Sequence, residues 1–252
     1  MAIRKIAQDA LGELRELIPK KIHYCWFGGK ELPDLARKCI ASWQKYCPDY
    51  EIIRWDESNF DLDQIPYTRW CYDNQKWAFL SDYARLAVVA EHGGVYLDTD
   101  VELVKPLDPL MGYEAFFGFE NESNVNTGQG FGAQASHPTV RAMQQQYLQM
   151  KPDDNGGFPV QACPALNTAA LIPMSLKLTG QRQNVAGAEI LPVEFFNPYD
   201  DATGRLHKTK NTVGIHWYSK SWVSRGLVLR SKIARPFRRI FGNDCFHWLK
   251  RK

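Results

Sequence analysis

The pattern of apolar and polar positions is clearest in the segment 76–104. Within residues 77–91, apolar side chains cover most of a helical circumference, which is typical of a helix buried between two layers. Gly93 and Gly94 then stop the helix, and residues 95–97 form a short apolar run. This segment therefore predicts a buried helix that leads into a buried strand, with two acids at the strand's end.

Similar patterns predict the other elements. We expect strands at 21–27, 51–55, 114–119, 130–133, 189–196 and 212–217, and helices at 3–17, 35–46, 138–150 and 166–178. Residues 57–72 are predicted to be a mostly irregular connection, and 151–158 a loop rich in Gly and Asp. This alternation predicts an α/β fold with a mixed, mainly parallel sheet and helices on both faces.

Composition supports one domain with a tail. The chain has 252 residues, of which 44% are hydrophobic, enough for one sizeable core and too few for two. We divide it into an N-terminal amphipathic helix at 1–18, a domain at 19–224 and a basic tail at 225–252. The six cysteines form no C-x-x-C pair, and no signal peptide or membrane span is evident. We therefore expect a reduced, cytoplasmic protein.

The two acids that follow the central strand carry the predicted chemistry. Alternation along an extended chain would point Asp98 and Asp100 to one side and Thr99 away. Two adjacent carboxylates repel each other unless a cation lies beside them, and open α/β sheets bind ligands at this edge. The pair predicts Mn²⁺ or Mg²⁺ and a phosphate-bearing ligand. A solvated turn is the alternative interpretation.

Two further clusters belong to the same predicted edge. Asp82 and Arg85 are three residues apart on the central helix, so they share a face. Gly28 and Gly29 follow the first strand and would let the backbone approach a nucleotide. Trp26, beside them, is a candidate for base stacking. The alternatives are a simple ion pair and a core tryptophan.

Three blocks resemble glycosyltransferase family 32, bacterial capsule and lipopolysaccharide transferases and fungal mannosyltransferases that contain a DXD sugar-binding region. They are IPKKIHYCWFGGKELP at 18–33, LSDYARLAVVAEHGGVYLDTD at 80–100 and HWYSKSW at 216–222. The middle block is the most specific, and it also resembles the glucosyltransferase domain of large clostridial toxins. The resemblance implies a GT-A-type fold, a nucleotide-sugar donor, a divalent metal and retention of anomeric configuration.

The resemblance also implies roles for residues on the metal and donor sides. Asp100 would ligate the metal, and Asp98 would support it while contacting ribose or sugar. Asp98, Asp100 and Arg85 would form the catalytic group, and Asp82 and Arg85 would hold sugar hydroxyls. The other implied nucleotide or sugar contacts are Trp26, Phe27, Gly28 and Ser81.

Later residues would complete the site by the same resemblance. His216 would complete the metal coordination, although a structural histidine at a strand end is the alternative. Ser221 and Trp222 would lie on a loop that closes over the diphosphate. Asn126 and Gln129 would face the anomeric centre, unless their segment is an ordinary hairpin. The C-P-A-L-N segment at 163–167 departs from the expected G-P pattern.

The function expected from these features is retaining, metal-dependent transfer of a sugar from a nucleotide-sugar donor, with a UDP-sugar as the favoured candidate, to a saccharide acceptor in capsule, O-antigen or lipooligosaccharide synthesis. A metal-dependent phosphohydrolase and a non-catalytic carbohydrate-binding protein are the alternatives. Retention requires either a covalent carboxylate adduct or front-face departure and attack. We favour the front-face route because the acids Glu120, Glu122, Asp153 and Asp154 are all predicted in loops.

The tail carries most of the chain's positive charge. Residues 225–252 hold nine Lys or Arg and one acid, which leaves 22 basic and 27 acidic residues in the rest of the chain. Its helical pattern puts five apolar residues on one side, namely Leu229, Ile233, Phe237, Ile240 and Phe241, and Pro236 would kink the helix or begin a second one. This pattern favours an anionic membrane surface, at the inner face of the cytoplasmic membrane, and a lipid-linked oligosaccharide acceptor over nucleic acid. A helix packed on the domain with a solvated basic face is the alternative.

Overall fold

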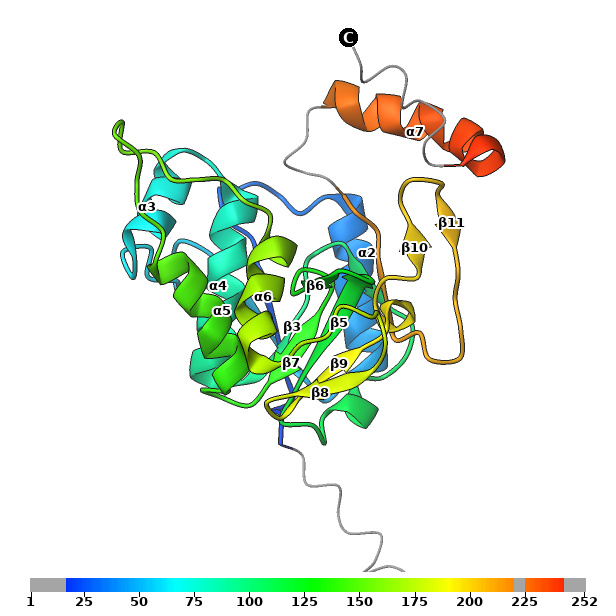
Figure 1. Cartoon of the computed structure of the whole chain (residues 1–252), viewed down its shortest axis with the longest axis horizontal. Coiled ribbons are helices and arrows are strands. Elements are labelled where there is room, and N and C mark those ends of the chain that lie inside the picture. Colours follow the sequence, from blue (N-terminus) through cyan, green and yellow to red (C-terminus); the bar gives the residue numbers. More distant parts are fainter. Residues whose placement is uncertain (1–16, 220–224, 243–252) are drawn as a thin grey trace, which may run out of the picture.

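The computed structural model describes residues 17–219 and 225–242. Its centre is an eight-stranded sheet in the order β2-β1-β3-β7-β5-β9-β8, with β6 paired to β5 (Figure 1). The strands are β1 (Lys21–Cys25), β2 (Glu51–Trp55), β3 (Gly94–Tyr96), β5 (Ala115–Asn121), β6 (Asn124–Asn126), β7 (Phe131–Ala133), β8 (Gln183–Val185) and β9 (Ala188–Leu191). Strands β2, β1, β3, β5 and β9 share one direction, while β6, β7 and β8 oppose them. The expected mixed, mainly parallel sheet is confirmed.

Helices cover both faces of this sheet, as expected for a GT-A-type fold (Figure 1). They are α2 (Asp34–Tyr46), α3 (Pro66–Asp73), α4 (Trp77–His92), α5 (Pro138–Leu148), α6 (Cys163–Leu171) and α7 (Arg225–Phe241). Helix α2 packs on one face, and α4, α5 and α6 lie on the other. Single 3₁₀ turns span Asp108–Leu110, Ile172–Met174 and Val193–Phe195.

Two small ribbons extend from the sheet. Strand β4 (Val101–Leu103) pairs antiparallel with β12 (Gly214–His216), and β10 (Tyr199–Asp200) pairs antiparallel with β11 (Arg205–Leu206). In the first ribbon, β4 is the next strand after β3 in the chain. The second forms a hairpin beside α7 (Figure 1).

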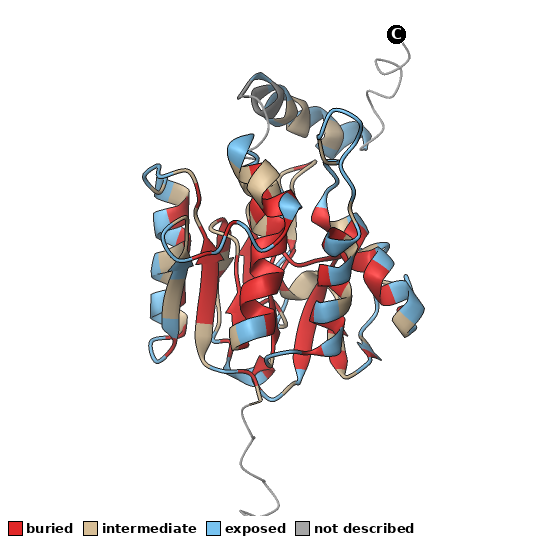
Figure 2. Cartoon of the chain, turned by 90° about the vertical axis from the view of Figure 1, so that its left-hand side faces the viewer, coloured by how far each residue is buried: buried red, intermediate tan, exposed pale blue. Residues whose placement is uncertain are grey.

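The central helix is buried as its pattern predicts. Leu80 and every residue from 82 to 90 are buried, so α4 lies between the sheet and the outer helices (Figure 2). Gly93 and Gly94 have φ angles of 63° and 110°, in a region that favours glycine. A Cβ on Gly94 would also lie 2.9 Å from the imidazole of His23. This tight turn feeds the chain directly into β3.

Alternation on β1 divides the core between the two faces of the sheet. Ile22 and Tyr24 belong to the cluster that includes Trp43 of α2, whereas Cys25 belongs to the cluster around α4. The indole of Trp43 also donates a 2.7 Å hydrogen bond to the carbonyl of Val101. The bond ties α2 to the ribbon that follows the two site acids.

Several expected boundaries were wrong. Residues 57–72 contain most of α3, which begins at Pro66, where a missing N–H costs no hydrogen bond. The helix expected at 166–178 begins at Cys163 and ends at Leu171, and the strand expected at 189–196 ends in a 3₁₀ turn. Pro236 lies inside a continuous α7. The helix expected at 3–17 lies outside the described residues except at its last position.

Candidate active site

The two site acids come together through a turn. Strand β3 ends at Tyr96, and the carbonyl of Asp98 accepts a 3.0 Å hydrogen bond from the amide of Val101. The expectation that strand alternation would align Asp98 and Asp100 was therefore wrong. A turn at Thr99 and Asp100 reverses the chain into β4, and this reversal brings the second carboxylate back beside the first.

On one side of the site, Arg85 joins two carboxylates. Its guanidinium lies 2.9 Å from Asp82 and 3.2 Å from Asp98, and its side chain is only 4% exposed. The hydroxyl of Tyr96 donates a further 2.9 Å hydrogen bond to Asp98. Burial raises the pKa of Asp98 and raises that of Asp82 to about 7, although Arg85 acts in the opposite direction on both. Arg85 thus supplies, from within the protein, the positive charge that faces the two carboxylates on this side of the site.

On the other side, Asp100 faces a histidine and a backbone amide. Its carboxylate accepts a 2.7 Å hydrogen bond from the N–H of Ser219 and lies 3.4 Å from Nε2 of His216. Burial alone would raise the pKa of Asp100, but His216 and the Ser219 amide hold it below its usual range. Burial would likewise lower the pKa of His216, yet the Asp100 carboxylate raises it.

Asp98, Asp100 and His216 form a possible metal cluster. One ligand atom from each residue lies within 4.8 Å of the other two. Strand pairing explains the approach, because His216 lies opposite Val101, the neighbour of Asp100. The Nδ1 atom of His216 is buried without a hydrogen-bond partner. Two carboxylates and an imidazole are a donor set that fits a divalent cation such as Mn²⁺.

The loop after β6 lies against the Arg85 side of the site. A Cβ on Gly128 would lie 2.6 Å from Asp98, 2.9 Å from Arg85 and 3.1 Å from Asn126. The side-chain oxygen of Asn126 accepts a 2.6 Å hydrogen bond from the amide N–H of Gly128. Its side-chain nitrogen donates a 3.3 Å hydrogen bond to the carboxylate of Glu120. Asn126 therefore lies beside the Arg85 side of the site, and its expected position at the anomeric centre stays a prediction.

Glu120 and Tyr218 are neighbours of the site that sequence reasoning did not assign. Glu120 is in strand β5, although the sequence predicted it in a loop. Its carboxylate accepts from the hydroxyl of Tyr218 at 3.3 Å, and the ring of Tyr218 lies 4.1 Å from that of His216. The sequence signal that could have identified Tyr218 was its position two residues after His216. No sequence signal pointed to Glu120, because it is far from both residues in the chain.

Cys163 occupies the wall where a glycine was expected. Its sulfur lies 3.6 Å from Arg85 and 3.5 Å from Asn126, at the first residue of α6. Burial raises the pKa of this thiol well above its usual value. Cys163 is therefore a neutral thiol that packs against the Arg85 side of the site.

The residues expected near the base differ in how accessible they are. Trp26 is partly exposed, and its indole donates to the carbonyl of Lys30 at 2.6 Å. The side chain of Phe27 is in the core, against Phe60. The amide of Gly28 donates to Glu57 at 2.6 Å, and a Cβ there would collide with Trp77.

Two other predicted contacts are directed into the protein. The Ser81 hydroxyl donates to the carbonyl of Trp77 within α4. Gln129 is fully buried and donates to the carbonyl of Phe119. Ser221 and Trp222 lie outside the described residues. The structure thus gathers Asp82, Arg85, Asp98, Asp100, Asn126 and His216.

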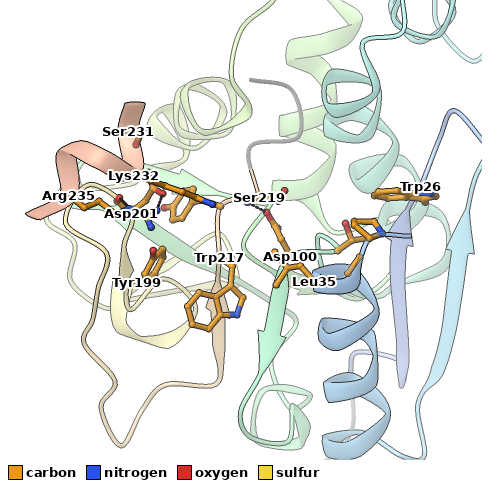
Figure 3. Close-up of a pocket in the computed structure, with 14 residues that line it drawn as sticks. Trp26, Leu35, Asp100, Tyr199, Asp201, Trp217, Ser219, Ser231, Lys232 and Arg235 are labelled. Carbon is orange, nitrogen blue, oxygen red and sulfur yellow. Dashed lines mark hydrogen bonds and ion pairs between the residues drawn. The ribbon is translucent and has the colours of Figure 1, made fainter. Parts of the chain in front are cut away.

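A pocket of about 460 Å³ opens beside Asp100 (Figure 3). In the figure, Trp26 lies at one end, side chains of α7 lie at the other, and Asp100 lies between them. The lining residues are Trp26, Pro33, Leu35, Ala36, Thr99, Asp100, Tyr199, Asp201, Trp217, Tyr218, Ser219, Ser231, Lys232 and Arg235. Four aromatic side chains and an acid beside the metal cluster make a surface suited to sugars and nucleotides.

Comparison with known proteins identifies similar sequences. The chain is 35% identical over 130 residues to inositol phosphoceramide mannosyltransferase 3 of Schizosaccharomyces pombe, covering 48% of this chain and 35% of that protein. It is 28% identical over 151 residues to inositol phosphoceramide mannosyltransferase 1 of the same organism, covering 55% and 46%. The chain therefore spans less than half the length of these relatives.

A solved structure described as PaToxG glycosyltransferase covers 68% of this chain and 77% of its own, with 17% identity and a TM-score of 0.44. Residues 33–117 match a family model described as "glycosyltransferase sugar-binding region containing DXD motif". The match contains the central helix, β3 and both site acids. The resemblance that we identified from the sequence is thus confirmed, and the chain carries a DXD-containing sugar-binding region of the glycosyltransferase type.

Proposed function

We propose that the protein is a retaining, metal-dependent glycosyltransferase that moves a sugar from a nucleotide sugar, with a UDP-sugar as the favoured candidate, to a saccharide or lipid-linked acceptor. The observation that carries this proposal is the cluster of Asp98, Asp100 and His216 beside the buried Arg85 pair. The named activity of the matched relatives supports the same class of reaction. Capsule, O-antigen or lipooligosaccharide synthesis is the process that we infer.

Asp98, Asp100 and His216 would hold the cation, Mn²⁺ or Mg²⁺. Such an ion supplies positive charge to the diphosphate that leaves during transfer. Arg85, fixed by Asp82, donates toward sugar hydroxyls, and Asp98 accepts from sugar or ribose hydroxyls. Because Arg85 is already held by two carboxylates, the site is organised before the donor binds.

Around the diphosphate and base, Trp26 would stack on the nucleobase while the backbone at Phe27 and Gly28 approaches it. Ser221 and Trp222 would cover the diphosphate. Ser81 and Gln129 would act by supporting the surrounding backbone, since their described hydrogen bonds point inward. The donor therefore extends from the Trp26 end of the pocket toward Arg85.

For retention we propose front-face transfer, in which the leaving phosphate accepts the acceptor's proton. Asn126 and Glu120 are the polar groups on the acceptor side, and they position the incoming hydroxyl. No enzyme nucleophile is used in this route, so a covalent glycosyl adduct on Glu120 found by mass spectrometry would contradict it.

The decisive experiment measures thermal stabilisation by UDP-, GDP- and other nucleotide sugars with and without Mn²⁺, together with sugar transfer or donor hydrolysis. A ligand that binds only the native state raises its stability, so one nucleotide should give a Mn²⁺-dependent shift. A phosphohydrolase would release phosphate without sugar transfer. A carbohydrate-binding protein would bind sugar equally well after Asp100→Asn.

A further inference from the structure

Helix α7 is attached to the protein through its basic side. Arg235 donates to the carboxylate of Asp201 at 2.9 Å and to its carbonyl at 3.1 Å, and Asp201 directly follows β10. Arg239 donates to the carbonyls of Thr203 at 2.6 Å and Gly204 at 3.0 Å. The guanidinium groups on this side are therefore used to hold the helix against the β10–β11 hairpin (Figure 1).

The opposite side of α7 exposes large apolar side chains. Ile233 is 62% exposed, Phe237 50%, Ile240 74% and Phe241 70%. At about 100° per residue these four positions fall within roughly one third of the helical circumference. Of the nine large apolar residues exposed in the described part of the chain, four lie on this one helix. The orientation is the reverse of a helix that packs its apolar side on the domain.

An anionic membrane surface fits the apolar side of α7. Arg230, three residues before Ile233 and therefore on the same side of the helix, is also exposed, and residues 225–252 carry nine basic residues against one acid. A second copy of the chain would bring an equally basic segment, so charge disfavours self-association there. Among the described residues no helix is long and apolar enough to cross a bilayer, and α7 itself contains six Lys or Arg. A helix with this pattern lies in the membrane interface.

The same helix forms one wall of the pocket beside Asp100. Ser231, Lys232 and Arg235 line that wall, and Tyr199 and Trp217 line the body side with ring centres 5.1 Å apart (Figure 3). A contact that fixes the orientation of α7 therefore also fixes the position of this pocket wall. Aromatic rings next to the metal cluster suit a sugar ring that enters from the α7 side.

We propose that α7 is an interfacial helix, inserted into an anionic membrane by Ile233, Phe237, Ile240 and Phe241, which presents the pocket to a saccharide carried on a membrane lipid. The inference that α7 binds a membrane rests on the exposure of these four residues and does not depend on the proposed function. The lipid-borne acceptor rests on the proposed glycosyltransferase function.

The test is flotation of the full chain with vesicles of phosphatidylcholine alone or mixed with phosphatidylglycerol. The triple variant Ile233→Ser, Ile240→Ser and Phe241→Ser removes apolar side chains that face away from the body. The matched control is Leu148→Ser, Ile172→Ser and Leu178→Ser, whose side chains are 48%, 50% and 47% exposed elsewhere. Wild type and control should float with the anionic vesicles, and the α7 variant should be retained at least about tenfold less.

Equal flotation of the α7 variant and wild type would overturn the proposal. So would wild-type protein that stays off anionic vesicles but forms dimers or captures a protein partner through α7. Donor hydrolysis in the absence of vesicles separates the two hypotheses, because α7 substitutions should leave it unchanged. Normal flotation without any hydrolysis or transfer would contradict the glycosyltransferase function alone. Normal hydrolysis without flotation would contradict the membrane inference alone.

Discussion

Asp98 and Asp100 belong to one motif but lie in two different electrostatic environments. Asp98 is held by Arg85 and Tyr96, so its charge is balanced within the protein. Asp100 faces His216 and one backbone amide, and the partner that balances its charge is itself titratable. The difference indicates that Asp98 is held within the protein by a permanent positive charge, whereas the charge of Asp100 is balanced by a partner that can lose its proton.

The largest expected effect tests the Asp100 side. Asp100→Asn should remove the Mn²⁺-dependent thermal shift and lower transfer by about 10²–10³-fold, because stabilisation of the leaving diphosphate is lost. Asp154→Asn, at an exposed loop position, is the control and should behave as wild type. If the Asp100 variant keeps its Mn²⁺ shift, the metal assignment is wrong.

A smaller loss is expected from the Asp98 side. Arg85→Lys keeps the positive charge but replaces the planar guanidinium by a compact ammonium group, so either the buried Asp82 or the half-buried Asp98 loses its partner. Unfolding free energy should fall by about 2 kcal/mol and transfer by about 10–100-fold. Chemical denaturation and initial rates measure the two effects. The Mn²⁺ shift should survive, and its disappearance would show that the two sides are not independent.

The pH dependence sharpens the comparison further. The pKa of His216 is raised, so in the metal-free protein its interaction with Asp100 stabilises fully below the unfolded histidine pKa. That stabilisation is lost as pH rises through the folded value. A cation competes with the imidazole proton, so the Mn²⁺ thermal shift should grow over the same rise in pH. His216→Gln should flatten this dependence, and a Mn²⁺ shift independent of pH in wild type would remove His216 from the ligands.

The smallest effect is expected at Glu120. Its negative charge helps to raise the pKa of His216, so Glu120→Gln should move the pH midpoint of the Mn²⁺ shift lower. Transfer should fall by no more than about tenfold, because the amide keeps an oxygen for Asn126 and Tyr218. Glu122→Gln, two residues away and exposed, provides the comparison. An unchanged pH midpoint in the Glu120 variant would exclude an electrostatic interaction between Glu120 and His216.

Sequence reasoning succeeded where the site is local in the chain. Helix α4, the Gly93–Gly94 turn and β3 are contiguous, so helical and strand periodicity were enough to place them. The i,i+3 spacing of Asp82 and Arg85 likewise indicated that these two side chains share a face, whereas the contact of Arg85 with Asp98 was not predicted. The match to residues 33–117 covers the same region.

Prediction failed where tertiary contacts decide the arrangement. Ser219 donates to Asp100 across 119 residues, and Glu120 contacts Tyr218 across 98 residues. The hydrophobic periodicity of a sequence carries no information about contacts between residues so far apart in the chain. The docking of α7 through Arg239 was not predicted for a similar reason, since this side chain bonds to backbone carbonyls in a hairpin that was not predicted. The alternation expected at Asp98 was overridden by the turn into β4.

The pairing of β12 with β4 has a consequence for biosynthesis. The ribosome makes the two site acids more than a hundred residues before it makes His216, and the ribbon cannot close until residues 214–216 have emerged. A nascent chain that ends before this point would carry both acids without their histidine. Under the proposed function, such chains would lack one of the three proposed ligands and should bind Mn²⁺ more weakly than the full chain.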